Sequence, residues 1–327
     1  MSSLLKNPLA RRILRPAADL VDARVQKPVS RLRRDVDSAA RAERDSARRD
    51  REALRGELEA LRREVADLRG RQYAVGLLFE RTGRSGHRVP TPAEIDTLVA
   101  QVAEVSGKDA AFARRNVTMA FRNVVALEAL AVGRLAGTTE NVCGKLATVP
   151  LLDPPNNEVL EIGTLHGLFA ATLMRMLHRA GMEPRLTIVD PLAGSQLQPG
   201  ATMGGDPTGT PVRMDVVRAN LALGGRAGEE ARVQQGLSGD EDVRAAVSDR
   251  RYGVIVIDGD HSAEGVAADL EWAEEIAAPG GVVVLDDYGD ESWLGVQEAA
   301  DRHLGAGGSR FELIGRVATS AFLRATR

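Results

Sequence analysis

The second half of the sequence predicts a doubly wound α/β domain built on a parallel sheet. Short, mainly apolar runs at 159–162, 186–189, 254–257 and 282–285 have the length of buried strands. Amphipathic stretches of helical length separate these runs, and strands joined by crossover helices pair in parallel. Ligands bind such sheets beyond the carboxyl ends of the strands, so the residues at those ends are the first candidates for chemistry.

The chain before this domain divides by composition into three segments. Residues 1–28 are a basic N-terminal segment, and residues 29–72 contain no proline and are rich in Arg, Glu, Asp and Ala, which is typical of a long exposed helix. Residues 73–150 predict a small helical subdomain that acts as a lid or in oligomerisation. Residues 151–327 then carry the α/β domain.

The long helix has a seam of apolar residues. They are spaced alternately four and three apart at Leu54, Leu58, Leu61, Val65 and Leu68. This spacing is the signature of a left-handed coiled coil and predicts a homo-oligomer held by the N-terminal helices. The alternative is a solvated helix that lies along its own domain.

Charge is unevenly distributed along the chain. Residues 1–72 hold 19 Lys plus Arg against 12 Asp plus Glu, and the other 255 residues hold 24 against 34. Acidic residues interleave with the arginines and no aromatic residue lies among them, so we expect no nucleic-acid partner. No run approaches the roughly 18 apolar residues of a membrane span, and the N-terminus lacks the apolar core of a signal peptide. A cytoplasmic protein is therefore expected, with the single Cys143 as an inert buried thiol.

Two helices are predicted in the helical subdomain. Thr91, Pro92 and Glu94 combine a side-chain cap, a proline in the first turn and a reciprocal acid, which together mark a helix start. A longer helix is predicted over 109–135, and 81–90 is a loop by composition.

The first three strands end in residues suited to a nucleotide-like cofactor. Gly163 and Gly167 follow the first strand and allow a tight turn into a helix N-terminus. They do not form the G-x-G-x-x-G pattern of dinucleotide-binding oxidoreductases. Asp190 ends the second strand, where a carboxylate can accept hydrogen bonds from ribose hydroxyls, and Ser238 lies in a turn that could flank an adenine ring.

The next two strands end in a cluster of carboxylates. Asp258 ends one strand, the Asp286 and Asp287 pair ends the next, and His261 follows the first of them by three residues. Close carboxylates repel one another unless a proton or a cation intervenes, and Mg²⁺ prefers oxygen ligands of this kind. His261 is placed to act as a base at the same edge. The alternative is that these aspartates cap helices.

The segments DGDH, PGG and LDDY, in this order between residues 258 and 288, carry a resemblance to a known family. Residues 157–324 resemble a class I S-adenosylmethionine-dependent methyltransferase, and more narrowly the metal-dependent O-methyltransferases that modify sugars on macrolides and related natural products. The family sheet has seven strands with the last antiparallel, which implies a Rossmann-like fold closed by 311–315 and 317–323. Asp286 departs from the glutamate that is common in the family.

The resemblance implies a role for each strand-end residue. The cofactor S-adenosyl-L-methionine would be held by Glu161, Gly163, Gly167, Asp190 and Ser238. The metal ligands would be Asp258, Asp286 and Asp287, with His261 as general base.

The predicted function is O-methylation of a hydroxyl on a sugar or glycosylated natural product with the help of Mg²⁺, which would lower the pKa of the hydroxyl. Two alternatives stay open: a metal-independent methyltransferase of a small molecule, and a non-catalytic scaffold that works through its coiled coil.

Overall fold

The computed structural model describes residues 27–78, 90–193 and 210–326, together with residues 16, 19, 20, 23 and 24. Chain contacts divide it into two compact units, Met1–Val75 and Gly76–Arg327. Residues 81–89 of the predicted loop at 81–90, most of the basic segment 1–28 and residues 194–209 lie outside the described residues.

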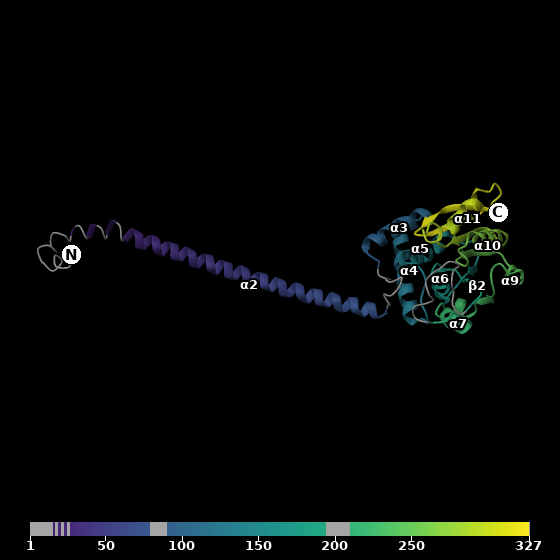
Figure 1. The fold of residues 1–327 in the computed structure, drawn as a ribbon, viewed down its shortest axis with the longest axis horizontal. Helices are drawn as coiled ribbons and strands as arrows, with labels where there is room; N and C mark the ends of the chain where they lie inside the picture. Colours follow the sequence, from purple (N-terminus) through teal and green to yellow (C-terminus); the bar gives the residue numbers. More distant parts are fainter. Residues whose placement is uncertain are drawn as a thin grey trace. The chain divides into compact units, whose positions relative to one another are not determined.

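The first unit is dominated by one helix, α2, which runs over Lys27–Leu78 (Figure 1). Its 52 residues correspond to roughly 78 Å of helix at 1.5 Å per residue. The five seam residues from Leu54 to Leu68 are between 44% and 63% exposed. The helix thus carries an apolar stripe that its own unit does not cover.

The second unit is built on a seven-stranded sheet in the order β3-β2-β1-β4-β5-β7-β6. The strands are β1 (Glu158–Ile162), β2 (Arg185–Asp190), β3 (Arg232–Gln235), β4 (Tyr252–Ile257), β5 (Ala277–Leu285), β6 (Phe311–Val317) and β7 (Ser320–Ala325). Strands β1 to β5 pair in parallel, and β7 is antiparallel to both of its neighbours. The predicted fold class is therefore confirmed.

Helices cover both faces of the sheet (Figure 1). They are α3 (Pro92–Ser106), α4 (Ala110–Leu130), α5 (Thr139–Thr148), α6 (Leu168–Arg179), α7 (Met214–Ala222), α8 (Arg226–Glu229), α9 (Glu241–Val247), α10 (Ala263–Ile276) and α11 (Leu294–Gly305), with a short 3-10 helix η3 (Val149–Leu152). Alternate strand residues divide between two apolar cores: Val254 packs on the side of α3 to α7, and Ile255 packs on the side of α9 to α11. No helix in the described parts of the chain has the length and apolar composition to cross a membrane.

The helix starts follow the predicted local chemistry better than the helix ends do. Thr91 and Glu94 form a reciprocal capping box at the start of α3, as predicted. The helix predicted over 109–135 ends earlier, at Leu130. The reason is tertiary, because Asn220 of α7 accepts a hydrogen bond from the backbone N–H of Val132 and donates one to its carbonyl. These bonds hold the backbone outside a helical conformation.

Candidate active site

The carboxyl ends of β1, β4 and β5 meet at one edge of the sheet. Backbone pairing continues past the strands, since the N–H of Asp258 donates to Ile162 O at 2.9 Å and the N–H of Asp286 donates to Ile257 O at 3.0 Å. Asp258 and Asp286, which were predicted to be neighbours, therefore lie on adjacent backbone segments that continue β4 and β5, as the strand order requires.

A lysine that the sequence did not single out lies between these two aspartates. Lys145 of α5 places Nζ 2.5 Å from Asp286 Oδ2 and 3.5 Å from Asp258 Oδ2, and its side chain is 3% exposed. The ammonium also lies over the ring of Phe169, 4.7 Å from its centroid. Burial alone would lower the pKa of Lys145, but the charges of Asp286 and Asp258 outweigh burial and raise that pKa above its ordinary value. The lysine is thus a buried, charged partner of both carboxylates.

Asp286 is fully engaged by donors. Its Oδ1 accepts hydrogen bonds from Asn141 Nδ2 and Ser320 Oγ, both at 2.8 Å, while Oδ2 faces Lys145. Burial disfavours the charged carboxylate, yet the lysine and these hydrogen bonds hold the pKa of Asp286 below its ordinary value. The side chain is therefore an ionised anchor rather than a proton carrier.

His261 lies between two other carboxylates. Its Nε2 is 3.4 Å from Asp258 Oδ1 and its Nδ1 is 3.5 Å from Asp287 Oδ2. The imidazole meets the ring of Trp293 edge-on at 4.8 Å between centroids. Burial would lower the pKa of His261, but Asp258 and Asp287 raise it above the ordinary value. Two carboxylates thus stabilise the protonated imidazole.

Asp287 differs from its neighbour in charge state and backbone. Burial, together with the charges of Asp286 and Asp258, raises its pKa to about 7. Its backbone is left-handed, with φ at 56°, a conformation that a non-glycine residue adopts at some cost in energy. The adjacent aspartates thus have opposite pKa shifts, because Lys145 pairs closely with only one of them.

The turn after β1 packs closely against the backbone segment that follows β4. Gly163 has a φ of 83°, and a Cβ at this position would lie 2.1 Å from the carbonyl oxygen of Asp258. Only glycine fits this approach. Gly167 then precedes α6, with a φ of 79°. The predicted pair of glycines therefore shapes a turn directly beside the aspartate cluster.

Two further predicted acids are buried in the same turn. Asp190 accepts hydrogen bonds from the backbone N–H groups of Thr164 at 2.6 Å, Leu165 at 3.3 Å and Leu192 at 2.7 Å. Glu161 accepts a hydrogen bond from the hydroxyl of Thr164, and burial raises the pKa of Glu161 to about 8. Both side chains hold the turn in place, and their predicted contacts with a cofactor remain a prediction.

Ser238 lies after β3, which β2 and β1 separate from β4 in the sheet. Its carbonyl accepts a hydrogen bond from Arg244 Nε at 2.5 Å, and Arg244 Nη2 lies 3.8 Å from the buried carboxylate of Asp269. Burial raises the pKa of Asp269 to about 6. The structure thus adds an acid of α10 to the region where an adenine ring was predicted.

These residues do not fit a magnesium ion. The described part of the chain contains no group of three or more His, Cys, Asp or Glu side chains arranged to hold a metal. Asp258, Asp286 and Asp287 are gathered as predicted, but the place between Asp258 and Asp286 is taken by the ammonium of Lys145. The repulsion between the carboxylates, which suggested a metal, is offset by the ammonium of Lys145 instead.

Sequence reasoning missed Asn141, Lys145 and Ser320. Asn141 and Lys145 are four residues apart on α5, so they share one face of that helix. Two polar side chains at this spacing on one face of a short helix were a usable signal. No comparable signal marked Ser320, which is brought in by the antiparallel strand β7.

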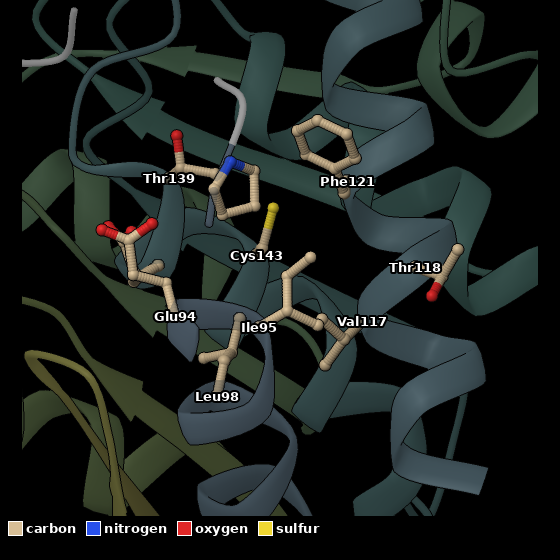
Figure 2. A pocket seen from close by; sticks show the side chains of 10 residues that line it. Glu94, Ile95, Leu98, Val117, Thr118, Phe121, Thr139 and Cys143 are labelled. Atoms are coloured by element: carbon tan, nitrogen blue, oxygen red, sulfur yellow. The ribbon is translucent and has the colours of Figure 1, made fainter. Parts of the chain in front are cut away.

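A small apolar pocket lies on the opposite face of α5. It has a volume of about 70 Å³ and is enclosed by side chains of α3, α4 and α5. Figure 2 shows the Cys143 thiol among Ile95, Leu98 and Phe121. Cys143 is buried, as expected. The lining of this pocket includes none of the aspartate cluster.

Comparisons with known proteins find similarity to methyltransferases. Residues 160–288 match the family model described as a methyltransferase domain. A search of curated proteins gave no significant match. Among solved structures, an O-methyltransferase from Bacillus cereus in complex with SAH is 17% identical, covers 71% of this chain and 100% of its own, and has a TM-score of 0.39. The O-methyltransferase TomG from Streptomyces achromogenes is 17% identical over 64% of this chain and 90% of its own, with a TM-score of 0.40.

Proposed function

We propose that residues 160–288, which match a methyltransferase-domain family model, form a class I S-adenosylmethionine-dependent methyltransferase domain, and that the protein methylates a hydroxyl group of a small molecule, a sugar or glycosylated natural product. The observation that carries the proposal is His261, held between Asp258 and Asp287 beside the glycine turn at Gly163. A base in this position suits an acceptor that must lose a proton as it is methylated.

The residues around the turn suit the cofactor. S-adenosylmethionine offers an ammonium group and ribose hydroxyls as donors, and Glu161 and Asp190 are carboxyl groups at the ends of β1 and β2. Gly163 and Gly167 keep side chains out of the turn that leads into α6. When bound, the cofactor supplies an electrophilic methyl group.

In the proposed mechanism, His261 in its neutral form accepts the hydroxyl proton of the acceptor as the oxygen gains the methyl group. The bond between the methyl and the sulfur of the cofactor would break, and the sulfur would leave as a neutral thioether. Asp258 and Asp287 stabilise the imidazolium that results, because each lies within 3.5 Å of a ring nitrogen. Trp293 packs against the ring edge and limits its rotation. Because the residues do not fit Mg²⁺, no step depends on a metal, and the metal-independent alternative is favoured over the mechanism expected from the sequence.

The test compares His261→Ala with His303→Ala. His303 is a matched control because its Nε2 pairs with Glu274 at 2.9 Å and it contacts none of the site residues. Glycosylated natural products are screened by mass spectrometry for a gain of one methyl. His261→Ala should lose about 10²-fold to 10⁴-fold in kcat and keep the cofactor affinity measured by calorimetry. Unchanged turnover in His261→Ala would remove this residue as the base.

We further propose that α2 pairs with α2 of a second copy of this chain. The exposed seam between Leu54 and Leu68 supports this, because an isolated helix with an apolar stripe gains stability when a partner covers it. Leu61→Asp in the full chain should lower the mass measured by light scattering, whereas Ala60→Asp, off the seam, should not. Equal masses for the two variants would exclude the coiled coil.

A further inference from the structure

The ammonium of Lys145 occupies the centre of the carboxylate cluster. Its Nζ lies 2.5 Å from Asp286 Oδ2 and 3.5 Å from Asp258 Oδ2. A cation that bridged the two carboxylates would bind these same two oxygens. Its third side faces the ring of Phe169, which attracts a cation through its π electrons. All the directions in which the ammonium can donate are therefore accounted for within the protein.

We propose that Lys145 is a resident cation that replaces a divalent metal at this site and positions the base His261 through Asp258. The inference rests on the proposed function in one respect, which is that the cluster of Asp258, Asp286 and Asp287 is the active site. It assigns Lys145 as a positioning residue, since the lysine contacts the carboxylates of Asp286 and Asp258 and the ring of Phe169.

A continuous chain of contacts supports this role. Asn141 and Ser320 fix Oδ1 of Asp286, and Oδ2 of Asp286 fixes the ammonium. The ammonium then holds Asp258 by Oδ2, which leaves Oδ1 of Asp258 facing His261 Nε2 at 3.4 Å. The lysine thereby determines which oxygen of Asp258 is directed at the histidine.

Charge balance supports the replacement of a metal. Three carboxyl groups crowd the site, and within the described parts of the chain the basic side chains of Lys145 and His261 contact them. The lysine ammonium contributes one positive charge. Unlike Mg²⁺, it has no further coordination positions that water or substrate would occupy. A metal placed at the same carboxylates would have to displace the ammonium from Asp286, its closest partner.

The inference predicts that removal of the lysine creates a metal site. Mn²⁺ binding is measured by electron paramagnetic resonance on the full chain, without cofactor or acceptor, so the outcome does not depend on methyl transfer. Wild type and the control Lys108→Ala, whose lysine forms an exposed pair with Asp153 at 3.0 Å, should show no saturable Mn²⁺ site. Lys145→Ala should bind one Mn²⁺, and the double variant Lys145→Ala/Asp286→Asn should lose it.

Lys145→Arg and Lys145→Gln complete the test. Lys145→Arg keeps a cation and should bind no Mn²⁺, whereas Lys145→Gln keeps a polar side chain without the charge and should bind it. If Lys145→Ala does not fold, the Mn²⁺-dependent rise in the melting temperature of Lys145→Gln, absent in wild type, supports the inference. A saturable Mn²⁺ site in wild type that Asp286→Asn abolishes would overturn it, as would folded Lys145→Ala and Lys145→Gln proteins that bind no Mn²⁺.

Discussion

Replacement of Lys145 by methionine should strongly destabilise the second unit, Gly76–Arg327, which contains the sheet. The substitution keeps the approximate length of the side chain and removes its charge, so Asp286, whose side chain is 9% exposed, is left buried without its counter-charge. Removing one partner of a buried pair typically costs about 3–5 kcal/mol. Each kcal/mol corresponds to roughly 2–4 °C in a unit of about this size, so the melting temperature should fall by roughly 6–20 °C.

The assay is calorimetric or urea unfolding of three variants at pH 8 and pH 5. Lys145→Met should lose less stability at pH 5, because the abandoned carboxylates can take up protons there. Lys145→Met/Asp286→Asn should recover much of the loss, since asparagine carries no charge that needs a partner. Lys108→Met removes an exposed pair and should change stability by at most about 1 kcal/mol. If Lys145→Met is as stable as Lys108→Met, the lysine is not the counter-charge of the cluster.

Two other predictions concern the turn after β1 and the acid of α10. Gly163→Ala should unfold at a markedly lower temperature and lose cofactor binding, because its Cβ would lie 2.1 Å from Asp258 O. Gly181→Ala is the control, since it shares a positive φ of 89° but has nothing within 4 Å, and equal melting temperatures would contradict the steric argument. Asp269 has a pKa raised to about 6, so its contribution to stability is complete below the unfolded pKa and is lost as pH rises through 6. Asp269→Asn should therefore gain up to about 3 kcal/mol over wild type at pH 8 and nothing near pH 4, as measured by urea unfolding, and a gain independent of pH would refute the assignment.

Local chemistry in the sequence was sufficient for the fold class and for part of the site. Apolar runs of strand length located all four of the central strands, and the rule for parallel sheets then placed Asp258 and Asp286 at a common edge. The capping box of Thr91 and Glu94 was equally local, because its donors and acceptors lie within one turn of helix. These features depend on residues close in sequence or on a general topological rule.

The tertiary structure decided which charge meets the aspartates. Lys145 comes from a helix that precedes the first strand, 141 positions from Asp286, and Ser320 comes from the last strand. The end of α4 at Leu130 was likewise set by Asn220, 88 positions from the backbone that it binds. A sequence pattern records the period of a helix, but it does not record which strand end that helix packs against. The sequence by itself therefore predicted that the carboxylates need a cation, and only the packing of α5 against the sheet brought Lys145 of the same chain beside Asp258 and Asp286.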